Sequence, residues 1–224
     1  GHLSDFAPAL RDFVRKEQHA RKNYTVDLYP EPSQFRVSRG EIVAASGDTG
    51  IGPVHLHYEL RDNKGRPINP RMLGITWPDT TTPKIRKILV MPDGPGSTVN
   101  GDIVPVVLEP RMVEPDRYVC DAVRATGRIG FGVDVIDPAN SGENVLGVYS
   151  VRTAVDAKET FRVLFDRFSY EERQHESVSY HPYLLNKGRF LLQWRWPDNT
   201  CEPYQQCESD GWYTVGKERA DVRI

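Results

Sequence analysis

Two histidines two positions apart, His55 and His57, are the residues of this chain with the clearest potential for chemistry. They lie in residues 54–60, where apolar and polar side chains alternate, and this alternation is typical of a half-buried β-strand. Side chains two apart on a strand point to the same face, so we expect both imidazoles to face one volume. Such a pair suits one metal ion, or one metal ion and one acid/base group. A strand whose polar face carries two incidental histidines is the simpler alternative.

The elements before this segment must bring it into position. The spacing of apolar residues predicts a helix over residues 9–23. Alternation predicts a strand over residues 24–30 and two short strands around an Arg-Gly turn over residues 35–47. Three glycines within residues 47–52 permit the tight turn that leads into the histidine segment. After it, residues 61–70 have the composition of a polar turn.

The second part of the chain has a different pattern. Residues 77–83 are rich in Thr and Pro and predict an extended linker. Short alternating segments separated by Gly, Pro and Asn turns follow it and predict an antiparallel β-sandwich over residues 84–224, truncated at its C-terminus. The predicted strands are residues 85–90, 102–108, 129–135, 148–155, 161–165, 190–194 and 212–215.

Length and composition bound the classes of function. The 224 residues suffice for one large domain or two small ones. A net charge of -2 gives no reason to expect binding to nucleic-acid phosphates. No apolar run approaches the roughly 18 to 20 residues of a membrane helix.

Both ends of the sequence suggest a piece of a longer protein, so a missing leader says nothing about export. Cys201 and Cys207 could form a small disulfide in an oxidising compartment or remain thiols.

Several segments of residues 1–76 resemble, in order, the motifs of the lysostaphin-type (LytM-like) zinc metalloendopeptidases. Residues 1–4 resemble the end of that family's Tyr-(Gly/Ala)-His-Leu motif, and residues 39–44 resemble its Lys-Gly-hydrophobic strand. Residues 47–50 resemble its Gly-Asn-Thr-Gly turn, and residues 52–59 resemble its Gly-Pro-His-Leu-His-Phe-Glu segment. Residues 63–70 resemble its closing Gly-x-Pro-hydrophobic-Asn-Pro motif. The helix-containing insertion after Ser4 and the sandwich that follows resemble the periplasmic or secreted Gram-negative branch.

This resemblance implies a bacterial hydrolase, exported to the periplasm or cell envelope, that uses one zinc ion to cut the peptide cross-links of cell-wall peptidoglycan. Its partners would be the peptide stems. His57 would be a zinc ligand, His55 a catalytic residue that does not bind the metal, and His2 a second catalytic histidine. His55 and His2 would polarise the attacking water and hold the oxyanion.

The implied fold is mostly β. Residues 1–76 would form the C-terminal part of a peptidase domain, a partial antiparallel sheet with one helical insertion. Residues 77–83 would be a linker, and residues 84–224 an Ig- or fibronectin-like β-sandwich.

The chain also departs from the family pattern. The family's other zinc ligands come from a His-x-x-x-Asp motif upstream of the position of His2, and the 224 residues contain no such motif. One imidazole does not hold zinc tightly, so we expect the chain as given to be inactive, with the remaining ligands upstream of Gly1. Val54 stands where the family usually has Pro before the first histidine.

The alternative function is a catalytically degenerate binding or activator module for cell-wall enzymes. A third interpretation is a β protein with incidental histidines.

Three other groups have weaker claims to chemistry. Four tryptophans could form a sugar-stacking face, although their spacing favours a core or rim position: Trp77, Trp194, Trp196 and Trp212. Four polar residues could bind calcium, although a plain turn is favoured: Asp134, Asp137, Asn140 and Glu143. Residues 170–183 contain His175 and His181, for which surface or hairpin-packing roles are favoured.

Overall fold

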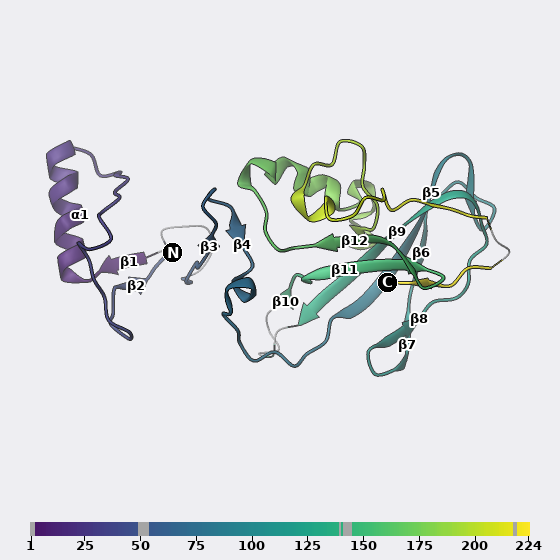
Figure 1. The fold of residues 1–224 in the computed structure, drawn as a ribbon, viewed down its shortest axis with the longest axis horizontal. Coiled ribbons are helices and arrows are strands. Elements are labelled where there is room, and N and C mark those ends of the chain that lie inside the picture. Colours follow the sequence, from purple (N-terminus) through teal and green to yellow (C-terminus); the bar gives the residue numbers. More distant parts are fainter. Residues whose placement is uncertain (1–2, 49–53, 139, 141–144, 217–218) are drawn as a thin grey trace. The chain divides into compact units, whose positions relative to one another are not determined.

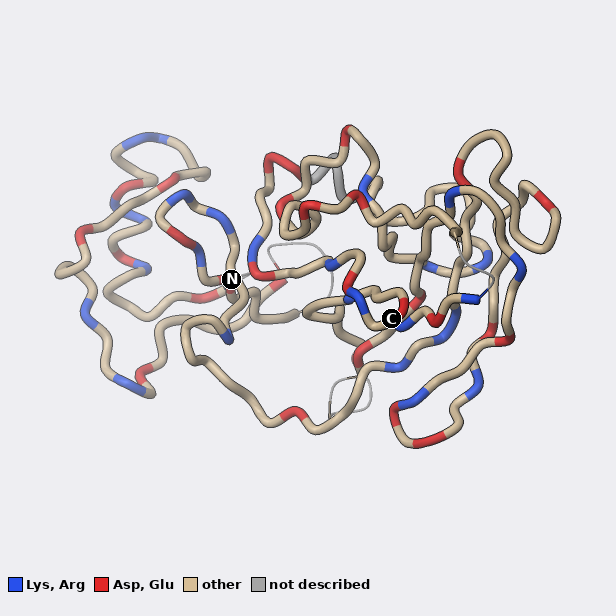
Figure 2. Tube along the Cα trace, turned by 45° about the vertical axis from the view of Figure 1, so that its right-hand side comes forward, with Lys and Arg blue, Asp and Glu red and all other residues tan. Residues whose placement is uncertain are grey.

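The computed structural model describes residues 3–48, 54–138, 140, 145–216 and 219–224. Within these residues the protein is mostly β, with one α-helix and several antiparallel sheets (Figure 1). This confirms the β-rich class that the alternating segments predict. The chain divides into two compact units, Gly1–Glu59 and Leu60–Ile224. Positive and negative side chains are interspersed along both (Figure 2).

The first unit contains the helix α1 (Pro8–Arg21) and a two-stranded sheet of β1 (Leu3–Phe6) and β2 (Ala44–Ser46). Pro8 suits the first helical position because a proline lacks the N–H that would have no helical acceptor there. Lys22 ends the helix in the left-handed conformation, with φ 48°. The helix agrees with the predicted range of 9–23 to within two residues at each end.

Several strands predicted in the first unit are wrong. Residues 24–30 contain no strand, and of residues 35–47 only β2 is one. Residues 54–59 run without strand pairing, and β3 (Leu60–Arg61) begins only at the end of the predicted histidine strand. Its expected apolar face is in water, with Val54, Leu56 and Tyr58 exposed by 60, 67 and 59%. Alternation produces a strand only where a neighbouring strand and a core accept it, and the described residues offer this segment neither.

The second unit is built on two long antiparallel strands, β5 (Lys84–Val99) and β9 (Ala125–Pro138). In their pairing Ile88 lies opposite Val133 and Leu89 opposite Gly132. Four short strands complete this sheet: β6 (Val106–Leu108) beside β5, and β10 (Val145–Leu146), β13 (Leu191–Leu192) and β14 (Tyr213–Thr214) beside β9. The sequence predicts residues 85–90 of β5 and residues 129–135 of β9, and its predicted segments 102–108, 190–194 and 212–215 contain β6, β13 and β14. Glycines and prolines interrupt the alternation toward the end of β5.

A second sheet has the strand order β12–β11–β15. Its strands are β11 (Ser150–Val155), β12 (Lys158–Leu164) and β15 (Val222–Arg223). Asp156 and Ala157 join β11 to β12 with φ values of 49° and 65°, the conformation that a two-residue hairpin turn requires. Two small hairpins are separate: β3 with β4 (Pro67–Ile68), and β7 (Arg111–Glu114) with β8 (Arg117–Val119). The 3-10 helices are η1 (Pro70–Leu73), η2 (Tyr170–Ser179), η3 (Pro182–Leu184) and η4 (Glu202–Tyr204).

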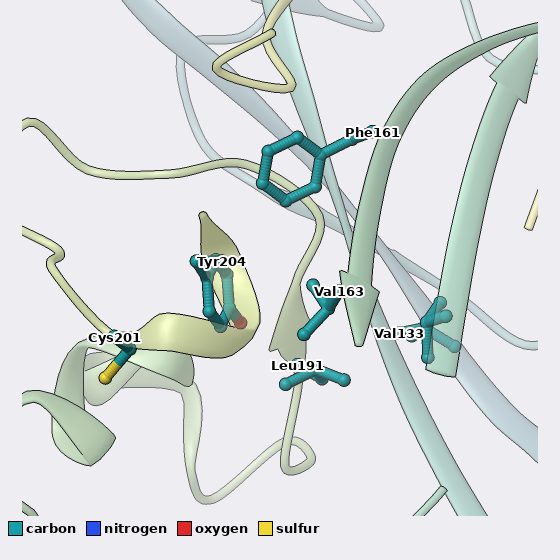
Figure 3. Close-up of a cluster of buried hydrophobic side chains, with 7 residues drawn as sticks. Val133, Phe161, Val163, Leu191, Cys201 and Tyr204 are labelled. Carbon is teal, nitrogen blue, oxygen red and sulfur yellow. The ribbon is translucent and has the colours of Figure 1, made fainter. Parts of the chain in front are cut away.

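The buried hydrophobic core lies in the second unit. One cluster joins the two sheets, because Val133 of β9 packs with residues of β11 and β12. Figure 3 shows this cluster, whose members are Val133, Val151, Phe161, Val163, Leu191, Cys201 and Tyr204. The rings of Phe161 and Tyr204 lie 6.0 Å apart. Two further clusters centre on Leu89 and on Val90.

Residues 60–76 make their long-range contacts within the second unit. The Arg66 guanidinium binds the Glu202 carboxylate at 3.0 Å. The backbone N–H of Asn69 donates to the carbonyl of Asp166 at 2.7 Å. This segment, which the sequence motifs group with residues 1–59, is therefore attached to η4 and to the chain that follows β12. No helix of the described residues is long and apolar enough to cross a membrane.

Candidate functional site

Strand pairing in the first unit brings two of the motifs together. β1 runs antiparallel to β2, with Leu3 opposite Ser46 and Phe6 opposite Ala44. Gly47 approaches β1 so closely that a Cβ atom there would lie 2.6 Å from the Cβ of Ser4. The residues that directly follow His2 therefore lie beside the start of the glycine turn. His2 itself lies outside the described residues.

His57 has a carboxylate partner on its own segment. Its Nε2 is in direct hydrogen-bonding contact with Oε1 of Glu59. The His57 side chain is 45% exposed and that of Glu59 18%. An imidazole that donates one N–H to a carboxylate has its orientation and tautomer fixed, and its lone pair then lies on the other ring nitrogen. His55 is exposed on the same extended segment.

The arrangement fits part of a metal site. A catalytic zinc needs three protein ligands, and His57 with Glu59 provides one imidazole and the carboxylate that would support it. Across the described ranges, no three His, Cys, Asp or Glu side chains lie close enough together to hold a metal ion. The described residues therefore suit one ligand of a zinc site and not a complete ligand set.

Three of the four tryptophans, Trp194, Trp196 and Trp212, pack against one another, whereas Trp77 lies apart from them. The ring of Trp194 lies 4.7 Å from that of Trp212 and 5.8 Å from that of Trp196. Trp194 is fully buried, and Trp77 instead lies beneath the guanidinium of Arg71. The group therefore occupies the core and rim of the long sheet.

The acidic stretch at the end of β9 is engaged with protein groups. Asp134 is buried and accepts a hydrogen bond from Nε of Arg86 at 3.1 Å. Burial raises the pKa of Asp137, and the charge of Asp79 raises it further. Asn140 accepts from the backbone N–H of Thr80 at 3.0 Å. Glu143 lies outside the described residues. These contacts account for Asp134 and Asn140 without a cation.

Burial distinguishes two groups that sequence patterns leave ambiguous. His181 is only 6% exposed, and burial lowers the pKa of its imidazole. Cys201 and Cys207 are thiols. Both pack at the cluster of Figure 3, where Cys207 contacts the carbonyl of Thr160 at 3.9 Å.

Comparisons of this chain with protein-family models, with curated proteins and with solved structures find no match.

Proposed function

We propose that this chain carries the histidine-bearing part of a zinc-dependent metalloendopeptidase of the lysostaphin type. The whole protein would be exported to the periplasm or cell envelope. There it would hydrolyse the peptide cross-links of bacterial cell-wall peptidoglycan. Residues 1–76 would belong to its peptidase domain.

The observation that carries this proposal is the pairing of β1 with β2. It places Leu3, of the first motif, opposite Ser46, which directly precedes the glycine-turn motif. These motifs lie some forty positions apart in the sequence, and a chance resemblance gives no reason for them to be neighbours in space. An active site needs such convergence, because its groups must meet at one reacting centre.

Each residue of the site would have a distinct role. His57 would hold the zinc ion, and Glu59 would fix the orientation of its ring. When bound, zinc lowers the pKa of a bound water and acts as a Lewis acid. His55, on the same segment, would take a proton from the attacking water. His2 would donate a hydrogen bond to the oxyanion.

We also propose that the two sheets of the second unit form an Ig- or fibronectin-like β-sandwich. Support comes from the cluster in which Val133 of one sheet packs with Val151 and Val163 of the other. Alternate residues of β11 and β12 are buried, as expected of strands with one inner face.

The test is hydrolysis of purified peptidoglycan by the full-length protein, followed as the release of new amino groups. We expect hydrolysis that a zinc chelator abolishes and that added zinc restores. His55→Ala should abolish it, whereas His19→Ala, in the exposed face of α1, should not. Hydrolysis that survives both chelation and His55→Ala would overturn the proposal. Binding to peptidoglycan without hydrolysis would instead support a catalytically degenerate binding or activator module.

A further inference from the structure

A bulge near the start of β5 gathers cations on the outer face of the long sheet. Asp134 of β9 lies on this face, because Val133 beside it points inward and packs with the second sheet. Arg86 is an extra residue in the register, Lys87 after it lies opposite Asp134, and Arg86 itself binds Asp134. The bulge thus brings two consecutive side chains to one face. Lys84, two positions before Arg86, lies on the same face by ordinary alternation.

The loop after η3 adds a further cation to this face. Nζ of Lys87 donates a hydrogen bond to the backbone carbonyl of Lys187. Gly188 lies against the sheet, where a Cβ atom would be 2.9 Å from Oδ2 of Asp134. These two contacts hold Lys187 beside the cations of β5. We call these four residues the cationic group: Lys84, Arg86, Lys87 and Lys187.

The cationic group carries more charge than its own carboxylate neutralises. Asp134, whose side chain is 5% exposed, pairs with Arg86, and in the described part of the chain the three lysines form no ion pair. The Arg86 side chain is 49% exposed, and Lys84 and Lys187 are exposed as well. Because the whole chain has a net charge of -2, the positive excess belongs to this face and not to the chain. Such an excess attracts anionic partners.

Two large apolar side chains project into water from the loop that carries Lys187. Tyr183, on η3, is 87% exposed, and Leu185, directly after η3, is 62% exposed. Leu184 between them packs against the cluster that contains Leu89. This inward contact attaches the loop to the sheet and leaves its two neighbours outside. A tyrosine and a leucine beside lysines suit the interface of a lipid bilayer, where an amphipathic ring lies at the level of the headgroups.

We propose that this face binds the surface of an anionic phospholipid bilayer. Tyr183 and Leu185 enter the headgroup region, and the cationic group contacts the lipid phosphates. Stable attachment to a bilayer takes two signals, and this face combines apolar insertion with positive charge. A bilayer is favoured over an acidic protein segment because it buries projecting side chains without a complementary groove. This inference is independent of the proposed peptidase function.

The β7–β8 hairpin provides a contrast within the same unit. Met112 is 64% exposed, as prominent as Leu185. The hairpin also carries the carboxylates of Glu114 and Asp116, which anionic headgroups would repel. An exposed apolar side chain is therefore not enough, and the proposal rests on its combination with the cationic group.

The experiment is co-sedimentation of the full 224-residue chain with vesicles of phosphatidylcholine, alone or mixed in equal parts with phosphatidylglycerol. We expect binding to the anionic vesicles only, and high salt should weaken it because salt screens charge. Lys187→Glu and Leu185→Glu should each weaken binding about fivefold or more, since each removes one of the two signals. Met112→Glu and Lys158→Glu, at exposed positions on the β7–β8 hairpin and on the second sheet, should leave binding unchanged.

Two competitors separate a bilayer from other anions. At matched ionic strength, inorganic phosphate should not release the chain from the vesicles, because a free ion offers Tyr183 and Leu185 no apolar surroundings. Polyglutamate should bind more weakly than the vesicles for the same reason. Absence of vesicle binding, equal binding to neutral and anionic vesicles, tighter binding to polyglutamate, release by inorganic phosphate, or binding that survives both Lys187→Glu and Leu185→Glu would each overturn the proposal.

Discussion

His57 and Glu59 show how a short spacing in the sequence becomes a specific contact. The alternation in residues 54–60 predicts that His55 and His57 share a face of a strand. The structure instead has an extended segment in which His57 bonds Glu59, two residues on. Periodicity describes which face a side chain occupies in a regular element, and it contains no information on contacts in a segment without a partner strand. The alternation places Glu59 on the same side of the segment as His57, but the bond between the two side chains could not be predicted from it.

The Asp62 carboxylate is held by three hydrogen bonds from its own turn. It accepts hydrogen bonds from the Arg66 side chain at 2.8 Å and from the backbone N–H groups of Arg66 and Lys64 at 3.0 and 2.9 Å. The bond from the Arg66 side chain is the largest cause of a pKa lowered from 3.8 to about 2, because it stabilises the ionised form.

This shift predicts a pH dependence of stability. Because the folded pKa lies below the unfolded one, the contribution of Asp62 is complete above pH 3.8 and is lost as the pH falls through about 2. The difference in melting temperature between the natural protein and Asp62→Asn should therefore shrink across this window. Thermal unfolding followed by circular dichroism measures it. A difference that stays constant from neutral pH to pH 2 would contradict the assignment.

Gly130 makes room for the tryptophan group. A Cβ atom at this position would lie 2.7 Å from ring carbons of both Trp194 and Trp212. Gly130→Ala should therefore lower the free energy of unfolding by about 1–3 kcal/mol, as overpacking does. Denaturant unfolding followed by tryptophan fluorescence checks this. Gly147→Ala is the matched control, because a Cβ there meets nothing within 4 Å. Equal effects of the two substitutions would disprove the packing role of Gly130.

At the scale of elements, the Tyr204 side chain connects η4 to the core. The Tyr204 hydroxyl lies 3.0 Å from the carbonyls of both Ser179 and Leu192, and its ring packs near Phe161 (Figure 3). Tyr204→Phe keeps the ring but leaves a buried carbonyl without its donor, so it should cost about 1–2 kcal/mol of unfolding free energy. Tyr183→Phe, at a position 87% exposed, should cost nothing measurable. Equal stability of both variants would show that the hydrogen bonds of the Tyr204 hydroxyl do not stabilise the fold.

The elements differ in how far their sequences predict them. α1 is recognisable because its periodicity and Pro8 agree. The first part of β5 and the middle of β9 are recognisable because they are apolar segments that cross the core, where every residue from Ile129 to Asp134 is buried. The predicted segments 190–194 and 212–215 contain the short strands β13 and β14, but their pairing with β9 is a long-range contact that local patterns do not contain.

At the scale of the whole molecule, stability should reside in the second unit. Its three clusters contain the buried hydrophobic side chains apart from Val155, whereas in the described part of Gly1–Glu59 only Gly47 is buried. A chain of residues 60–224 should therefore unfold cooperatively at the melting temperature of the whole chain, as measured by calorimetry.

Removal of residues 219–224 provides the contrast. It deletes β15 and Ile224, and Ile224 packs against two of the clusters. This deletion should lower the melting temperature. If loss of residues 1–59 were the more damaging of the two deletions, the core would have been located wrongly.

The zinc content of the full-length protein tests the central claim most directly. Elemental analysis of the purified natural protein, His57→Ala and His55→Ala should give one zinc ion in the first, none in the second and one in the third. This follows from a ligand role for His57 and a catalytic role for His55. Full zinc content in His57→Ala would contradict the account.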